Sequence, residues 1–206
     1  IWQESDKDLA ARYRFGSTPF EPGDIRLADL NGDSIIDANN DRKFIGSRVP
    51  DFVASLQNTI TYKNFDLTFL LLMRYGQTIE AEFLGRYNPS GEGNGPSIID
   101  YWTPENPTND FPRPQKGASI SNLFGYQSLY YIDGSFFKIR NVSLGYTLPA
   151  NISKKFFVER LRIYATGTNL FVKARSHLVK DYDPERGGAE SAPLTRQFVF
   201  GVNVNF

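Results

Sequence analysis

The sequence predicts an all-β fold whose long strands cross a membrane as part of a β-barrel. Apolar and polar residues alternate with period two over segments of the roughly 9 to 11 residues that a tilted membrane-crossing strand needs. Short and long connections between these segments alternate along the chain, which is how transmembrane β-barrels are built and which a soluble sandwich has no reason to obey. Aromatic residues make up 15% of the chain, a composition that suits strands and membrane interfaces.

The first two segments form a hairpin. Residues 51–62 place one set of apolar side chains opposite a polar set, namely Phe52, Ala54, Leu56, Ile60 and Tyr62 against Ser55, Gln57, Thr59 and Thr61. Residues 65–76 do the same, with Phe65, Leu67, Phe69, Leu71, Met73 and Tyr75 against Asp66, Thr68 and Arg74. Since only two residues separate the segments, they are expected to pair as antiparallel neighbours.

Three more strands are expected later in the chain. In residues 136–148 the apolar phase changes after Ile139, which predicts a bulge or a strand that starts late. In residues 160–172 the two phases are balanced, so the sequence leaves the facing of this strand open. Residues 196–206 alternate clearly: Phe198, Phe200, Val202, Val204 and Phe206 oppose Gln197, Gly201, Asn203 and Asn205.

The lengths of the connections predict which ends of the strands face the periplasm and which face the cell exterior. The links 62–65 and 149–159 are short, and "NISKKFF" in the second predicts one helical turn. The links 76–135 and 173–195 are long and rich in Gly, Pro, Asn and charge. Short turns belong on the periplasmic side and long loops outside the cell. Five strands cannot close a barrel, and every backbone group in lipid must be paired, so further strands are expected from outside this chain.

Composition excludes several classes of protein. A formal net charge of zero gives no nucleic-acid footprint, and the absence of cysteine excludes disulfide scaffolds, thiol catalysis and cysteine-ligated zinc. The densest apolar run, Phe69 to Met73, is far too short for a spanning helix. The chain starts without Met or a signal pattern and is expected to be a fragment or a processed piece. The lone His177 is interpreted as an exposed loop residue.

Six ordered motifs carry a family resemblance: "PGDIRLADLNGDSIIDANNDRKFIG", "YWTPENPTNDFPR", "YYIDGSFFKIRNVSLGYTLP", "RLRIYATGTNLFV", "DYDPE" and "FVFGVNVNF". From Pro22 onward the chain resembles the C-terminal end of SusC/RagA-family TonB-dependent outer-membrane transporters. The resemblance implies the last strands of a barrel of the 22-stranded class, with the plug and the TonB-contacting part lying outside this chain. Residues 1–51 would then be an extracellular loop region and residues 52–206 the barrel strands.

The resemblance also implies function and partners. Such transporters import oligosaccharides or oligopeptides with energy delivered by TonB, and they pair with a SusD-like surface lipoprotein that covers the extracellular mouth. Strand faces then become predictions: Phe65, Leu67, Phe69, Leu71, Val202, Val204 and Phe206 toward outer-membrane lipid, and Thr59, Thr61, Asn203 and Asn205 toward the lumen. The terminal Phe206 resembles the signal that outer-membrane insertion machinery recognises, or else belongs to the periplasmic aromatic girdle.

The acidic stretch "DLNGDSIID" predicts a calcium site. Its oxygen ligands would be Asp29, Asn31, Asp33, the Ile35 carbonyl and Asp37, at the spacing of an EF-hand loop, within residues 29–41. The match weakens at Ser34, where the EF-hand has glycine, and at Asn40, where it has a bidentate Glu, so Asp41 would supply the missing charge. The alternative is an acidic turn held by Asx-type hydrogen bonds without an ion.

Aromatic loop residues are the remaining candidates. Trp102 and Phe111 lie among prolines and could form a platform for sugar stacking, but a structural loop or a contact with the lid is favoured. The same alternatives apply to Tyr130 and Tyr131. Acidic residues 133, 181, 183 and 185 could be paired as acid and base, but no segment positions them, so we expect no enzyme activity. The alternative function is a soluble, calcium-stabilised β-sandwich that binds carbohydrate, from which detergent dependence would separate the transporter.

Overall fold

The computed structural model describes residues 1–86, 97–116, 126–180, 182–189 and 194–206. The chain divides into two compact units. Unit 1 contains residues 1–46, 79–132 and 188–190, and unit 2 contains residues 47–78, 133–187 and 191–206. Among the described residues, no helix is both long enough and apolar enough to cross a membrane.

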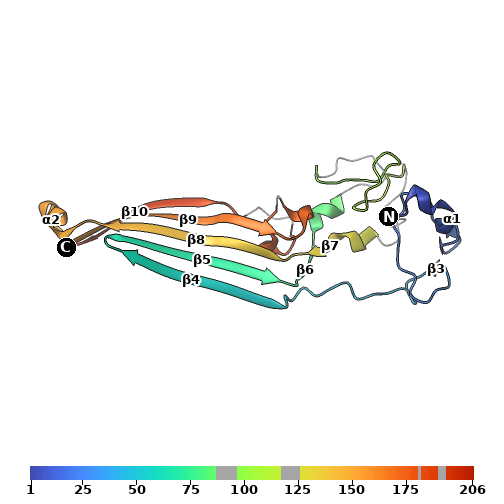
Figure 1. The fold of residues 1–206 in the computed structure, drawn as a ribbon, viewed down its shortest axis with the longest axis horizontal. Helices are drawn as coiled ribbons and strands as arrows, with labels where there is room; N and C mark the ends of the chain where they lie inside the picture. The colour runs from blue at the N-terminus through green and yellow to red at the C-terminus, as the bar shows by residue number, and fades with distance from the viewer. Residues whose placement is uncertain (87–96, 117–125, 181, 190–193) are drawn as a thin grey trace. The chain divides into compact units, whose positions relative to one another are not determined.

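Unit 2 is built on one antiparallel sheet of five strands in the order β10-β9-β8-β5-β4 (Figure 1). The strands are β4 (Phe52–Tyr62), β5 (Phe65–Tyr75), β8 (Phe136–Thr147), β9 (Arg160–Ala174) and β10 (Gln197–Asn205). All five strands expected from the alternation are confirmed, with ends within two residues of the predicted ones. Strands that follow one another in the chain are therefore neighbours in this sheet. The short strands β6 and β7, which lie in the long link between β5 and β8, form a separate pair.

The short connections lie at one end of this sheet. The β4–β5 turn consists of Lys63, in the left-handed region at φ 53°, and Asn64. The β8–β9 link holds α2 (Ala150–Ser153) and η5 (Lys154–Phe156), which confirms the expected helical turn. Strand β10 also ends there, beside α2 (Figure 1). The opposite end of the sheet carries the link after β5 and the link from β9 to β10, which contains η6 (His177–Val179) and η7 (Pro184–Arg186).

The predicted irregularity in the third strand is a β-bulge. The pairing of β5 with β8 passes from Leu71↔Ile139 to Leu70↔Asn141, so Arg140 is the extra residue. A second shift follows in β9, where Asn169 adopts φ 55°. Because a bulge reverses the alternation, Ile139 and Val142 come to lie on the same face of the sheet.

Unit 1 consists of short elements around its own core. These are η1 (Glu4–Asp6), α1 (Lys7–Ala10), β1 (Arg14–Phe15), β2 (Thr18–Pro19), β3 (Ile35–Ile36), β6 (Thr78–Glu80), η2 (Glu82–Arg86), η4 (Tyr126–Tyr130) and β7 (Tyr131–Asp133). Strands β2, β1 and β3 form one small sheet, and β6 pairs with β7. The buried apolar residues include Trp2, Ala10, Ile36, Phe83, Leu84, Trp102 and Phe111. Residues 79–132 therefore group with the N-terminal region predicted as loop, rather than with the strands.

Candidate functional site

The pairing register divides the five-stranded sheet into an apolar face and a polar face. Residues that pair directly across antiparallel strands point to the same side. One pairing series runs Ile60↔Leu67↔Leu144↔Ala165↔Phe200 through all five strands. The apolar face built in this way consists of Phe52, Ala54, Leu56, Asn58, Ile60, Tyr62, Phe65, Leu67, Phe69, Leu71, Met73, Tyr75, Phe137, Ile139, Val142, Leu144, Tyr146, Leu161, Ile163, Ala165, Gly167, Phe171, Lys173, Phe198, Phe200, Val202 and Val204.

The residues predicted to face lipid and lumen lie on opposite faces of the sheet, except Phe206, which follows the last paired residue of β10 and is not placed by the register. Phe65, Leu67, Phe69, Leu71, Val202 and Val204 belong to the apolar face. Thr59 pairs with Thr68, and Asn203 with Arg162, on the polar face. The register also settles β9, whose facing the sequence left open: Leu161, Ile163 and Ala165 join the apolar face. One face of the five-stranded sheet thus consists almost entirely of apolar side chains.

Much of the apolar face is exposed among the residues that the structure describes. Leu144 in the central strand is 50% exposed and Phe200 is 79% exposed. A β-sandwich would bury such a face against a second sheet, whereas here the large sheet is a single layer of five strands. An exposed apolar surface of this extent calls for an apolar surrounding, which lipid supplies.

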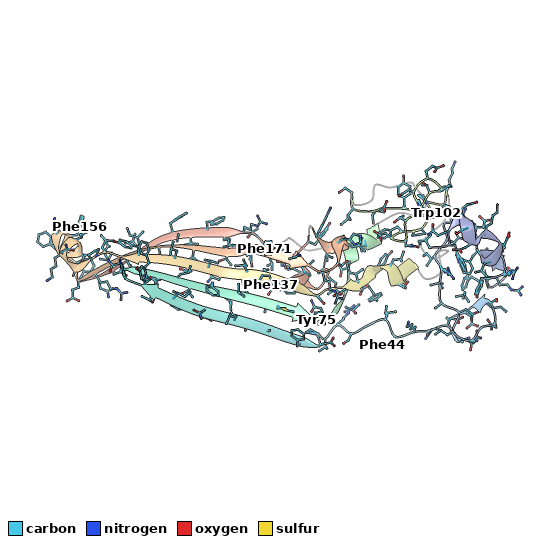
Figure 2. The ribbon with its side chains drawn as sticks, in the orientation of Figure 1. Phe44, Tyr75, Trp102, Phe137, Phe156 and Phe171 are labelled. Atoms are coloured by element: carbon cyan, nitrogen blue, oxygen red, sulfur yellow. The ribbon has the colours of Figure 1, made fainter. Side chains whose placement is uncertain are left out.

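Aromatic side chains border the apolar face at both ends of the strands. At the long-link end each strand contributes one ring, and this first aromatic row consists of Phe52, Tyr75, Phe137, Phe171 and Phe198. Rings 52 and 75 stack with centroids 5.3 Å apart. The second aromatic row, at the short-link end, consists of Tyr62, Phe65 and Tyr146. Figure 2 labels Tyr75, Phe137 and Phe171 in the first row.

The first aromatic row crosses the strands diagonally. Tyr75 pairs directly with Phe52, whereas Phe137 pairs with Met73 and Phe171 with Ile139, so the row is level between β4 and β5 and then shifts by two residues at β8 and again at β9. From β4 to β10 the average shift is about 1.5 residues per strand, or ~5 Å along a strand for each ~4.8 Å across, which corresponds to a tilt of about 45°. At that tilt the ten-residue separation of Phe52 and Tyr62 spans about 24 Å along the membrane normal, close to the ~25 Å apolar band of outer-membrane barrels.

The polar face carries an ion pair that crosses a whole strand. Arg162 of β9 donates to the Asp66 carboxylate of β5 from Nε at 2.9 Å and from Nη2 at 2.5 Å. The intervening residue of β8 is Gly145, and a Cβ there would lie 2.3 Å from Arg162 Nη2 and 2.5 Å from Asp66 Oδ1. Glycine therefore leaves the space through which the two charged side chains meet.

The same arrangement recurs one strand further on. Tyr164 pairs with Gly201 of β10, and a Cβ at that glycine would lie 2.4 Å from the Tyr164 ring. The Arg162 guanidinium lies 5.1 Å from the centroid of this ring. Two glycines thus let charged and aromatic side chains lie flat across the polar face.

A second charged cluster joins the polar face to the link after β9. Lys138 of β8 is 1% exposed, and its Nζ lies 2.5 Å from Asp183 Oδ2 and 2.8 Å from Glu185 Oε2. Arg140 Nη1 lies 3.2 Å from Glu185 Oε1. Sequence reasoning treated the two acidic residues as unpositioned, and this was wrong: the lysine and arginine of β8 hold both.

The other acidic candidates outside residues 29–41 are not gathered into a catalytic pair in the described structure. Asp133 lies 3.3 Å from Arg175 Nε in an ion pair at the end of the sheet. Residue 181 lies outside the described residues. Asp183 and Glu185 are both neutralised by basic partners, which is unlike the free carboxylate pair of a glycosidase.

The acidic loop of residues 29–41 directs its side-chain oxygens mainly at its own backbone. Asp29 accepts hydrogen bonds from Gly32 N at 2.7 Å and Ser34 N at 2.9 Å, and Asp33 Oδ1 accepts from Ile35 N at 2.8 Å. Asp41 closes the loop by accepting from Leu30 N and Asp37 N, both at 2.8 Å. Asn31 Oδ1 accepts from Asp33 N at 3.2 Å. This is the hydrogen bonding of Asx-type turns.

Other hydrogen bonds in this loop affect the ionisation of Asp37. Backbone N–H donors of Asn40 and Asn39, together with the Asn40 side chain, hold the pKa of Asp37 below its ordinary value. Within the part of the chain that the structure describes, no group of three or more acidic, histidine or cysteine side chains is placed to hold a metal ion. Calcium binding through the Ile35 carbonyl and the five side-chain ligands remains a prediction.

The proline-rich aromatic loop is part of the core of unit 1. Trp102 is 4% exposed and Phe111 is fully buried. Trp102 N donates to the Phe111 carbonyl at 3.0 Å, and the indole Nε1 donates to Gln3 Oε1 at 2.8 Å. Gly23 packs so closely on the indole that a Cβ there would lie 2.6 Å from it. The structural-loop interpretation accounts for both aromatic residues.

The two tyrosines lie at the junction of η4 and β7. The Tyr130 carbonyl accepts a hydrogen bond from Ala81 N at 2.8 Å, and burial raises the pKa of its phenol to about 12. Tyr131 is exposed. A separate hollow of about 500 Å³ in unit 1 is lined by Phe20, Glu21, Trp102, Pro104 and Arg113 among others. Contact of any of these residues with substrate or a lid remains a prediction.

Comparisons with known proteins give the class. No family model matches the chain. It is 32% identical over 221 residues to TonB-dependent receptor P26 of Formosa agariphila, an alignment that covers 100% of this chain and 21% of that receptor. It is 26% identical over 193 residues to TonB-dependent receptor SusC of Bacteroides thetaiotaomicron, covering 90% of this chain and 18% of SusC. The chain therefore spans about a fifth of the length of these curated relatives.

Solved structures share the fold. A chain of the RagAB peptide importer in its open-open state superposes with a TM-score of 0.63 at 21% identity, covering 84% of this chain and 19% of that one. A structure of the RagAB peptide transporter gives a TM-score of 0.66 at 18% identity, covering 94% and 24%. The two-faced sheet is accordingly a wall segment of an outer-membrane β-barrel. The chain belongs to the TonB-dependent receptors, in the group that includes SusC.

Proposed function

We propose that this chain forms part of the wall of a TonB-dependent transporter that imports oligosaccharides or oligopeptides. The observation that carries the proposal is the two-faced sheet: an exposed apolar face bounded by two aromatic rows, opposite a polar face that holds the Asp66–Arg162 ion pair. The apolar face lies against lipid, and the polar face lines the lumen through which cargo passes. The similarity to SusC and to the RagAB importer supports transport as the activity.

Neighbouring residues of β8 provide a direct test of this orientation. Ser143 lies on the polar face and Leu144 on the apolar face. Since the chain contains no cysteine, Ser143→Cys and Leu144→Cys each introduce one thiol into this wall. In the full-length receptor in outer membranes, with any other cysteines replaced, a water-soluble maleimide is expected to label the first thiol and a lipid-soluble maleimide the second. Equal labelling of both thiols by the water-soluble reagent would contradict a lipid-facing apolar side and favour the soluble module.

The partner and cargo belong to the same proposal. A SusD-like surface lipoprotein would pair with the full-length receptor at the end of the sheet where the long links lie, and TonB would act through parts outside this chain. The same tagged receptor, purified from outer membranes, is expected to bring this lipoprotein with it. The carboxylates and guanidinium groups of the polar face suit hydrogen bonding to either sugars or peptide backbone, so both cargo classes are retained.

Calcium binding by residues 29–41 is a further proposal, supported by the EF-hand-like spacing of the oxygen donors. Calorimetric titration of the full-length receptor with Ca²⁺ is expected to show one binding event that the Asp29→Asn/Asp33→Asn variant loses, since each change removes a carboxylate charge. Asp100→Asn is the matched control, because its carboxylate lies outside residues 29–41 and accepts from Asn106. Identical titrations for the double variant and the unmodified receptor would leave the Asx-turn alternative.

A further inference from the structure

Lys138 is the most buried charged side chain among the described residues. It is 1% exposed, although it lies in a single-layer sheet where most side chains are half or fully exposed. Leu72, its partner in β5, and Phe136, two residues before it, are also buried. By register all three belong to the polar face, at the end where the long links leave the sheet. The polar face is therefore covered at this end.

The link after β9 reaches this covered end through charged contacts. Asp183 and Glu185 place carboxylate oxygens 2.5 and 2.8 Å from Lys138 Nζ, and the two acidic side chains are themselves only 9% and 10% exposed. Arg140, the bulged residue of β8, adds a third contact at 3.2 Å from Glu185. Two positive and two negative charges thus balance within one cluster.

The segment that carries the carboxylates is locally ordered. Asp183 caps η7 by accepting from Glu185 N at 3.1 Å, and Pro184 occupies the first position of that turn. Gly187 ends the turn in the left-handed conformation at φ 69°. Val179, in η6, is 1% exposed. Residues 183–187 therefore present both carboxylates to the lysine from a hydrogen-bonded turn, rather than from an extended loop.

A buried lysine needs such partners, because removing an ammonium from water is costly unless opposite charges and hydrogen bonds replace the water. The carboxylates have the same requirement: if either the lysine or the two carboxylates were removed, the remaining buried charge would lack a partner. The cluster thus acts as an anchor for the segment at one position on β8.

We propose that Lys138 is a positioning residue that fixes the segment formed by residues 176–180 and 182–187 against the lumen-facing side of the wall. The segment is then a stationary part of the extracellular entrance, which narrows it from one side, and cargo passes beside it without displacing it. The location inside the barrel rests on the proposed function, which assigns the polar face to the lumen. The anchoring itself rests on the ion pairs alone.

The test measures the position of the segment in the full-length receptor in nanodiscs. Spin labels at Lys63→Cys, in the β4–β5 turn, and Lys180→Cys, in the segment, report their separation by pulsed electron spin resonance. We expect a narrow distance distribution in the otherwise unmodified receptor and at least a doubling of its width in Lys138→Met. The triple variant Lys138→Met/Asp183→Asn/Glu185→Gln is expected to restore much of the narrow distribution, because no buried charge then lacks a partner. Lys173→Met, an exposed lysine near the same end of the sheet, is the control.

A second readout is trypsin cleavage within the segment, which we expect to be faster in Lys138→Met by on the order of tenfold, since cleavage follows the population of the opened state. If Lys138→Met does not insert, Glu185→Gln leaves the Asp183 contact in place and is expected to broaden the distribution to a smaller extent. An unchanged distribution in a folded Lys138→Met or Glu185→Gln receptor would overturn the anchor. Failure of the maleimide test with the anchor intact would instead overturn the assignment of the polar face to the lumen.

Discussion

Replacement of Phe69 by arginine is expected to destabilise the folded receptor by roughly 2 to 4 kcal/mol, the cost of a cation at the bilayer midplane on the lipid face of a barrel. Phe69 lies near the middle of β5, between Asn58 and Val142 on the apolar face, and about midway between the two aromatic rows. An arginine there cannot reach the membrane surface along the strand without disturbing the packing of its neighbours.

Thr68→Arg is the matched control for Phe69→Arg. Thr68 is the preceding residue at nearly the same depth, but it lies on the polar face, where its hydroxyl is 3.1 Å from that of Thr59. This variant should lose at most about 1 kcal/mol, the scale of one neutral hydrogen bond. The two losses of stability are compared by measuring the denaturant midpoints of both variant receptors in lipid vesicles. Comparable losses in the two variants would mean that the apolar face does not contact lipid.

Gly145→Val is expected to destabilise the wall by about 1.5 to 3 kcal/mol, the range for hydrogen bonds to charged groups. Valine is the better strand former of the two residues, so intrinsic propensity predicts the opposite sign. The structure reverses this expectation because a Cβ at position 145 would occupy the space in which Arg162 meets Asp66. Both side chains would have to move apart, and each would keep its charge on the polar face without its partner.

A double-mutant cycle isolates this effect. In the Asp66→Asn/Arg162→Gln background the ion pair is absent, so adding Gly145→Val should cost much less than it does in the unmodified receptor. The measurement is the denaturant midpoint of the four receptors in lipid vesicles. A cost of Gly145→Val that is the same in both backgrounds would show that the glycine is needed for some reason other than the ion pair.

Much of the wall was predictable because strand alternation is a local property of the chain. The hairpin of β4 and β5 follows from two alternating segments with two residues between them, and both its limits and its faces are as expected. The phase change after Ile139 predicted the bulge at Arg140 for the same reason. The resemblance to SusC/RagA transporters is likewise carried by motifs of consecutive residues, which is why the class of protein could be recognised without coordinates.

Contacts between distant residues were beyond the reach of the sequence. In β9 the apolar and polar phases are balanced, and only its pairing with β8 and β10 places Ile163 on the apolar face and Arg162 on the polar face. The diagonal course of the first aromatic row, and with it the strand tilt, depends on the same register. The burial of Trp102 and Phe111 inside unit 1 was also not evident from the sequence, because the partner of the Trp102 indole, Gln3, lies 99 residues away in the chain.

By itself, then, the sequence determined the strands, their turns and the existence of an apolar face, since each depends on residues close together in the chain. Only the tertiary structure decided which charges meet. Lys138 lies 45 and 47 residues before the two carboxylates it contacts, and Asp66 lies 96 residues before Arg162. No local pattern relates residues so far apart. Strand register brings Asp66 and Arg162 to a common face of the sheet, and the folding of the link after β9 onto β8 brings the two carboxylates to Lys138.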